Sequence, residues 1–300
     1  MDMNRAARAS LRPLPVDFHR RRVDVGQNYT PVKFVATDTM PTVTSDGVSI
    51  AYEVVGRGPP VLMLAGLAGV GRSWGPQVDL FAQSFTVILP DHRGTGASER
   101  TTANMTVRQH AADTARVLDA VGLGACHVIG YSTGGAIAQL MGIHHARHVT
   151  SLTIAASLAR ADAYFRRQFV MRRRMLADSG PRAAIEASAL FLFDPEFQRS
   201  NVSTVERWVD VASSAAYDPA IAAARIDMIV SHDALDDLPR ITCPTHIIAG
   251  SRDFCAPPYF SRELADVIPG ARLTLLDGGH FIFLEQPNLF YRSVTAFLVA

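Results

Sequence analysis

Short apolar segments recur along the chain and alternate with helical patterns, and this alternation constrains the fold more than any other feature. Segments 61–64 and 85–89 are almost continuously apolar, as expected of strands that are covered on both faces. Similar segments occur at 126–129, 149–155, 245–249 and 272–276, and helical periodicity at 107–121, 134–143 and 287–298. This order predicts an α/β fold with a mostly parallel central sheet flanked by helices.

The places where the alternation of strand and helix patterns stops predict how the chain divides into parts. Segment 43–55, broken by Asp46-Gly47, predicts a hairpin. Residues 158–236 contain helical patterns and no clear strand, which predicts a helical cap inserted into the sheet domain. We therefore expect an α/β core at 41–157 and 237–300, a cap at 158–236, and a partly disordered tail at 1–40.

Charge and cysteine content narrow the class of protein. The net charge is +1, which gives no case for a nucleic-acid partner, although the arginine-rich start could be a targeting segment or a nucleic-acid arm instead of a solvated tail. The apolar runs fall short of the roughly 18 residues that span a membrane. Three cysteines without a C-x-x-C pair favour a reducing compartment, so we expect a cytoplasmic protein without a membrane partner.

Gly130-Tyr131-Ser132-Thr133-Gly134 fits the G-x-S-x-G pattern of a nucleophile elbow. It lies between an expected strand and an expected helix, which is the context that the pattern requires. The tight turn lifts a serine hydroxyl clear of the sheet, and glycines two residues away on either side avoid a collision. Ser132 is therefore the candidate nucleophile. An ordinary serine in a glycine-rich turn is the alternative.

A serine nucleophile needs a base, and the base needs an acid to orient it. Asp253 and His280 each follow an expected strand, in the chain order that this pattern predicts. We prefer Asp253 to Asp277, which shares a loop with His280. His144 and His148 have a zinc-ligand spacing but lack the accompanying glutamate, so we expect no metal.

The loop after segment 61–64 offers an oxyanion hole. We expect the backbone N–H groups of Leu67 and Thr133 to stabilise a developing negative charge. Gly66, Gly69 and Gly71, with Asp91 further along, could instead form a dinucleotide site, but their spacing is not G-x-G-x-x-G. We therefore expect no organic cofactor. The turn that begins at Asp91 is interpreted as structural, with Arg93 bonding across loops.

These motifs together resemble those of capped α/β-hydrolases from about residue 43 onward. The resemblance rests on the oxyanion loop at 64–67, Asp91-His92-Arg93-Gly94, the elbow, Asp253 and Gly279-His280. Within that superfamily the chain resembles the enol-lactonase and aminoacrylate-hydrolase groups, and its elbow resembles that of cofactor-free haloperoxidases and perhydrolases. One departure is Ala65-Gly66. Many relatives have His-Gly at these positions, and the histidine side chain helps to fix the loop.

The expected function is hydrolysis of a small carboxylic ester, lactone or enol-lactone through an acyl-enzyme on Ser132. Hydrolysis of an amide, a carbamate or a C–C bond, perhydrolysis or acyl transfer are alternatives, as is a non-catalytic ligand-binding protein. We expect Trp74, Tyr131 and Arg173 to contact the substrate, with Arg173 pointing inward to bind a carboxylate. A solvated basic helix face is the alternative for Arg173. The oligomeric state is not predicted.

Overall fold

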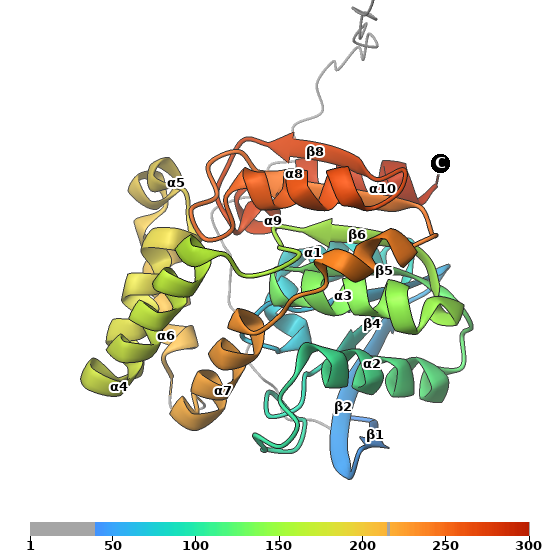
Figure 1. The fold of residues 1–300 in the computed structure, drawn as a ribbon, viewed down its shortest axis with the longest axis horizontal. Helices are drawn as coiled ribbons and strands as arrows, with labels where there is room; N and C mark the ends of the chain where they lie inside the picture. The colour runs from blue at the N-terminus through green and yellow to red at the C-terminus, as the bar shows by residue number, and fades with distance from the viewer. Residues whose placement is uncertain (1–39, 215–216, 300) are drawn as a thin grey trace, which may run out of the picture. The chain divides into compact units, whose positions relative to one another are not determined.

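The computed structural model describes residues 40–214 and 217–299, so nearly all of the tail expected at 1–40 lies outside the described residues. Within this part of the chain, eight strands form one sheet in the order β1-β2-β4-β3-β5-β6-β7-β8 (Figure 1). The strands are β1 (Thr42–Ser45), β2 (Val48–Gly56), β3 (Pro60–Leu64), β4 (Thr86–Pro90), β5 (Cys126–Tyr131), β6 (Val149–Ala155), β7 (Thr245–Gly250) and β8 (Arg272–Leu276). The pairs β1–β2 and β2–β4 are antiparallel and all others are parallel. The predicted fold class is confirmed.

Along the chain, the helices lie between strands, and the last two follow the final strand. The α-helices are α1 (Pro76–Ala82), α2 (Val107–Val121), α3 (Thr133–His144), α4 (Ala163–Leu192), α5 (Pro195–Ser200), α6 (Val202–Ala212), α7 (Pro219–Val230), α8 (Pro258–Val267), α9 (Ile282–Glu285) and α10 (Pro287–Leu298). Three short 3-10 turns complete the set: η1 (Gly71–Trp74), η2 (Ala146–His148) and η3 (Leu235–Arg240). Among the described residues, no helix has the length and apolar character needed to cross a membrane.

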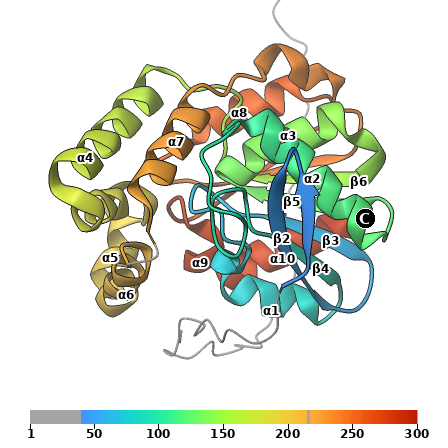
Figure 2. The same cartoon turned by 90° about the horizontal axis from the view of Figure 1, so that it is seen from below.

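Apolar side chains from both faces of the strands explain why the strand segments lack polar alternation. Along β3, Leu62 and Leu64 enter the core that α2, α3 and α8 cover, whereas Val61 and Met63 enter the core beneath α1, α9 and α10. Figure 2 shows the helices around the sheet from another side. Because both faces of the central strands are buried, the period-two pattern of a half-exposed strand disappears.

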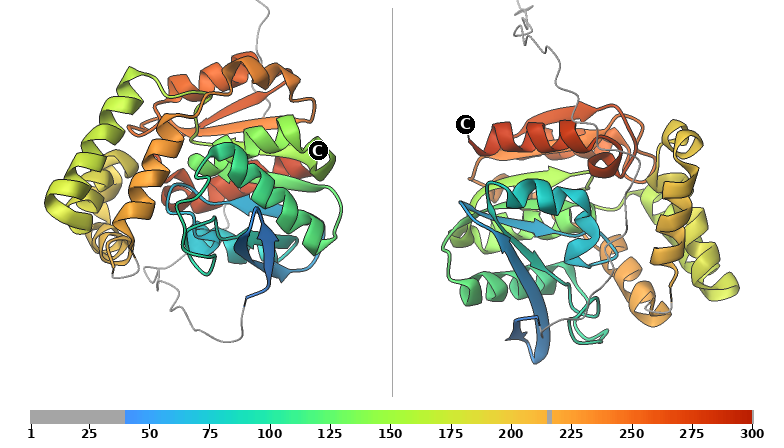
Figure 3. Two further views of the ribbon diagram at one scale, coloured as in Figure 1. Left: turned by 60° about the horizontal axis from the view of Figure 1, so that its bottom comes forward. Right: turned by 180° about the vertical axis from the view of Figure 1, so that it is seen from behind.

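Helices α4 to α7 form a group between β6 and β7, which we call the cap (Figures 1 and 3). Helix α4 bends at Gly180, whose φ of 81° is not helical, and Pro181 follows directly. The cap begins where the chain leaves the carboxyl end of β6. It is therefore well placed to cover the ends of parallel strands, where open α/β sheets bind ligands.

Candidate active site

Ser132 occupies a strained turn between β5 and α3. Its φ and ψ are 53° and −118°, a conformation that a residue with a side chain rarely adopts. A Cβ atom at Gly130 would lie 2.2 Å from the Gly134 carbonyl oxygen, and one at Gly134 would lie 2.2 Å from that of Leu64. Both positions therefore require glycine, and the turn that they permit projects the serine hydroxyl from the sheet.

The loops after β7 and β8 bring a histidine and a carboxylate to this serine. Nε2 of His280 lies 3.0 Å from the Ser132 hydroxyl, and Nδ1 of His280 lies 2.7 Å from one carboxylate oxygen of Asp253. The other oxygen of Asp253 accepts the backbone N–H groups of Cys255 and Ala256, each at 2.8 Å. These bonds fix the carboxylate, and a carboxylate at Nδ1 favours the tautomer whose Nε2 lone pair faces the hydroxyl.

The electrostatic surroundings of His280 suit a base that must hold a proton temporarily. The side chain is 1% exposed, and burial alone would lower its pKa. Burial is the largest single influence, but the charge and hydrogen bond of Asp253, together with the neighbouring Cys255, outweigh it and raise the pKa of His280 above the ordinary 6.5. Asp277, the other carboxylate near His280 in sequence, is exposed and pairs with Arg252. The structure therefore brings Ser132, His280 and Asp253 together and leaves Asp277 outside.

The loop between β3 and η1 lies directly against the serine. A Cβ at Gly66 would lie 2.8 Å from the Tyr131 ring and 3.5 Å from the Ser132 Cβ. Within the described residues, the backbone N–H groups of Leu67 and Thr133 donate no hydrogen bond. The N–H of Thr133 also lies at the first turn of α3, where the helix dipole favours negative charge. Two free donors beside one hydroxyl are the elements that an oxyanion hole requires.

Tyr131 and Trp74, both expected to contact a substrate, are both buried but have different neighbours. The Tyr131 ring centre is 5.1 Å from that of His280, so this residue lies against the candidate triad. Trp74 is 1% exposed and packs its ring against Phe283 and Phe290 in the core beneath α1 and α10. The expectation that Trp74 contacts the substrate is therefore corrected. Its indole is enclosed by core side chains and packs beneath the elbow.

The predicted inward orientation of Arg173 is wrong. Its side chain is 51% exposed and pairs with Asp227, 3.1 Å away on α7. Its neighbour Arg172 is buried instead, with its guanidinium 4.5 Å above the Phe169 ring. Successive residues of a helix differ by about 100° in direction, and the inner face of α4 runs through Phe165, Phe169, Arg172 and Leu176.

Arg172 lies on the buried face of α4 and has no carboxylate partner among the described residues. One turn earlier, Gln168 donates its amide to the Cys255 carbonyl oxygen at 3.2 Å, which places the inner face of α4 over the loop that holds Asp253. Burial raises the pKa of Tyr131, and the positive charge of Arg172 opposes that rise. The guanidinium therefore acts electrostatically on the residue that precedes the candidate nucleophile.

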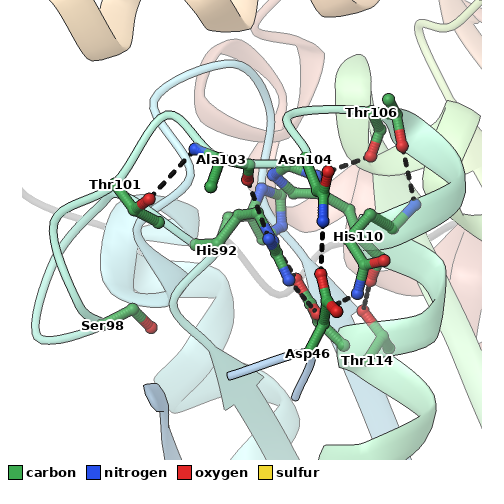
Figure 4. A network of polar contacts seen from close by, with 12 residues as sticks. Asp46, His92, Ser98, Thr101, Ala103, Asn104, Thr106, His110 and Thr114 are labelled. Carbon is green, nitrogen blue, oxygen red and sulfur yellow. Dashed lines mark hydrogen bonds and ion pairs between the residues drawn. The ribbon is translucent and has the colours of Figure 1, made fainter. Parts of the chain in front are cut away.

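Asp91 and Arg93 serve the structure of their own turn. Asp91 accepts the backbone N–H groups of Gly71 and Ala97, each at 2.8 Å, so its carboxylate is already used within the fold. Arg93 is fully buried and forms two hydrogen bonds to Asp113 on α2, at 2.7 and 2.8 Å. Figure 4 shows the polar network around this turn, which includes the carbonyl of Ala103. The structural interpretation of Arg93 agrees with these contacts.

Arg225 is a site residue that the sequence reading missed. It comes from α7, is 2% exposed, and donates from Nε to the Leu67 carbonyl oxygen at 2.6 Å. The one signal in the sequence is its spacing, because Ile221 and Ile229 lie four residues away on either side and are buried with it. A charged residue on the apolar face of a helix is a candidate for a buried polar contact.

The chain is similar to several known proteins over most of its length. A family model described as "alpha/beta hydrolase fold" matches residues 59–287. A protein of Azorhizobium caulinodans named "Putative carbamate hydrolase RutD" is 36% identical over 261 residues, covering 86% of this chain and 98% of that protein. The crystal structure of the enol-lactonase from Burkholderia xenovorans LB400 has a TM-score of 0.80 at 25% identity, covering 87% of this chain and 100% of that chain. A malate-bound thermophilic esterase from Thermogutta terrifontis has a TM-score of 0.76 at 27% identity, covering 86% and 96%.

Proposed function

Because the chain belongs to the α/β-hydrolase fold family, we propose that it is a serine hydrolase whose nucleophile is Ser132, with His280 as general base and Asp253 as the orienting acid. The observation that carries this proposal is the continuous contact from Asp253 through His280 to the serine hydroxyl, with distances of 2.7 and 3.0 Å. A hydroxyl is a weak nucleophile by itself, and such an arrangement is how a protein activates one.

The first half of the reaction forms an acyl-enzyme. Ser132 Oγ attacks the substrate carbonyl carbon while Nε2 of His280 takes the hydroxyl proton, and Asp253 stabilises the resulting imidazolium. The carbonyl oxygen becomes an oxyanion beside the N–H groups of Leu67 and Thr133. The bond to the leaving group then breaks, and the leaving atom receives the proton from His280.

The second half returns the enzyme to its starting state. His280 takes a proton from water, and the water oxygen attacks the acyl carbon to form a second tetrahedral oxyanion. The bond to Ser132 breaks as His280 returns a proton to the serine oxygen. Proton transfer and charge stabilisation are thereby assigned to side chains and backbone groups of this chain.

Small esters and lactones are the substrates that we favour. The enol-lactonase and the thermophilic esterase support this class, since each resembles this chain over more than four fifths of its length. A carbamate is the second candidate, because the curated relative from Azorhizobium caulinodans carries that name. The same triad can hydrolyse both classes of substrate. The residues that contact the rest of the substrate must therefore discriminate between esters and carbamates.

We also propose that the substrate carries a carboxylate and that Arg172, not Arg173, binds it. The Arg172 guanidinium is buried on the inner face of α4 and has no acidic partner among the described residues. A guanidinium presents a planar set of donors that matches a carboxylate. The esterase neighbour, solved with malate bound, supports the same class of ligand.

Covalent labelling of the serine tests the proposed nucleophile. We expect a fluorophosphonate probe to add one label to the wild-type protein, visible by intact mass, and none to the Ser132→Ala variant. Ser261→Ala is a matched control, because Ser261 is a buried serine on α8 away from the elbow, and it should label like wild type. Absence of a label on folded wild-type protein would contradict the proposal. Hydrolysis rates on matched p-nitrophenyl esters and carbamates, together with a lactone, would then separate the two substrate classes.

A further inference from the structure

A buried guanidinium in the cap contacts the loop that we assign to the oxyanion hole. Arg225 lies on α7 and is 2% exposed, yet it has no carboxylate partner among the described residues. Its donors reach the carbonyl oxygens of Leu67 at 2.6 Å and Gly66 at 3.5 Å. The other partners are Nδ1 of His92 at 3.0 Å and Nε2 of His110 at 3.1 Å. An isolated buried charge is costly, so this arrangement needs an explanation.

The two histidines act as neutral acceptors. An arginine has no acceptor atom, so His92 Nδ1 and His110 Nε2 must each offer a lone pair to it. Burial first, and then the charge of Arg225, lower the pKa of both rings, that of His110 to about 3. Nδ1 of His110 is left to donate to the Thr106 carbonyl oxygen at 2.9 Å, and Figure 4 shows these histidines close together. Both rings therefore hold the guanidinium in one position without neutralising it.

The direction of each of these carbonyls determines the direction of the N–H group in the same peptide. The described residues contain no cis peptide bond, and in a trans peptide the C=O and the following N–H point in opposite directions. The Gly66 carbonyl points toward Arg225 and also accepts the Gly69 N–H at 3.0 Å. The Leu67 N–H in the same peptide therefore points away from Arg225. The Leu67 carbonyl imposes the same direction on the N–H of Ala68.

The opposite side of this loop is the side of the nucleophile. A Cβ at Gly66 would lie 3.5 Å from the Ser132 Cβ, whereas a Cβ at Gly69 would lie 2.8 Å from a terminal nitrogen of Arg225. The loop is thus held between the serine and the arginine. Position 65 is alanine, so the residue before Gly66 has no polar side chain to hold these peptides.

We propose that Arg225 is a positioning residue that holds the Gly66 and Leu67 carbonyls, so that the Leu67 N–H faces the oxyanion. This inference rests on the proposed serine-hydrolase function. Loss of the guanidinium would leave the two carbonyls free to turn, and one donor would leave the oxyanion hole. The donor matters only when negative charge develops, so the turnover step should suffer more than substrate binding.

The test compares Arg225→Met and Arg225→Lys with wild type on a neutral p-nitrophenyl ester. We expect kcat to fall by about 100-fold in Arg225→Met, the usual loss for one oxyanion donor, while KM changes by less than about threefold. Arg225→Lys keeps a cation that can reach the Leu67 carbonyl, so it should lose less. The inhibition constant for phenylboronic acid, which forms a tetrahedral adduct with an active serine, should rise by the same factor as kcat falls.

A matched control separates positioning from loss of stability. Ile226→Ala removes a buried side chain from the same helix and leaves the guanidinium in place. It should lower the melting temperature and leave kcat of the folded protein nearly unchanged. If Arg225→Met and Ile226→Ala both melt earlier and both keep wild-type kcat and boronate affinity, Arg225 has only a structural role. If wild type itself takes no fluorophosphonate label, the serine-hydrolase function fails instead, so the two failures are distinguishable.

Discussion

Arg93 belongs to the core and Arg225 to the cap, and both side chains are almost fully buried, at 0% and 2% exposed. Arg93 forms two hydrogen bonds with the carboxylate of Asp113, at 2.7 and 2.8 Å. Arg225 faces two backbone carbonyls and two neutral histidines, and burial lowers its pKa to about 9. The core neutralises its buried charge locally, whereas the cap leaves its charge uncompensated beside the proposed oxyanion loop.

The same contrast extends to the regions that contain these residues. The core holds Ser132, Asp253 and His280 on turns at strand ends, where backbone hydrogen bonds and glycines fix each position. The cap contributes Arg172 and Arg225, whose positions depend on which face of a helix each side chain occupies. We infer that core charges serve stability and chemistry, and that cap charges serve orientation and specificity. Variants in each region test this distinction.

The largest effect should come from breaking the neutralised pair in the core. Arg93→Met leaves the Asp113 carboxylate buried without its partner, and we expect the free energy of unfolding to fall by about 3–5 kcal/mol. Chemical denaturation measures this loss. The folded fraction should keep kcat within about threefold, because Arg93 contacts neither the triad nor the oxyanion loop.

A double variant provides the control for this prediction. Arg93→Met with Asp113→Leu removes both charges and should recover part of the lost stability, since an apolar pair can replace a buried ion pair. A fall in kcat of the folded protein as large as that of Arg225→Met would contradict the distinction between core and cap.

A smaller effect should come from the cap, and on binding. Arg172→Met should raise KM for the half-ester p-nitrophenyl hydrogen succinate by about 10- to 100-fold, because a charge-assisted pair contributes about 1.5–3 kcal/mol. KM for the neutral p-nitrophenyl butyrate should stay nearly constant. Steady-state kinetics on the two substrates make the measurement, since only one of them carries a carboxylate.

Arg173→Met is the matched control for Arg172, since Arg173 is the next residue and pairs with Asp227 on the outer face. It should leave KM for both substrates at the wild-type value. Equal changes in the two arginine variants would show a general effect of cap charge and would argue against a carboxylate site at Arg172.

The sequence predicted the strands of the fold better than its short helices. The central strand segments, such as 61–64 and 85–89, are apolar on both faces, and that pattern is visible without tertiary information. Helices α1 and α8 were not predicted, because seven and ten residues give too few turns for a periodic pattern. In α8, burial on one face depends mainly on Phe260 and Leu264, two residues that form no repeating series.

The candidate site divides in the same way. The elbow, the acid and the histidine could be proposed from the sequence because each follows a strand and each is fixed by local backbone geometry. Arg172 could not be separated from Arg173, since both fit a spacing of three or four residues on α4. Arg225 could not be proposed either, because its partners Leu67 and His110 lie 158 and 115 residues away in the chain.

The smallest expected effect, a shift of the pH profile, should belong to the core alone. His280 can take the serine proton only when its imidazole is neutral, and Asp253 raises its pKa above 6.5 despite the opposing effect of burial. A raised pKa keeps the ring protonated to higher pH, so kcat/KM should be low at acid pH and reach half its plateau above pH 6.5. Asp253→Asn should move this midpoint to lower pH, since burial then acts without the opposing charge. The rate of fluorophosphonate labelling against pH measures the midpoint in wild type and in the variant. Arg172→Met should leave the midpoint unchanged, so a shift in that cap variant and none in Asp253→Asn would reverse the assignment of chemistry to the core.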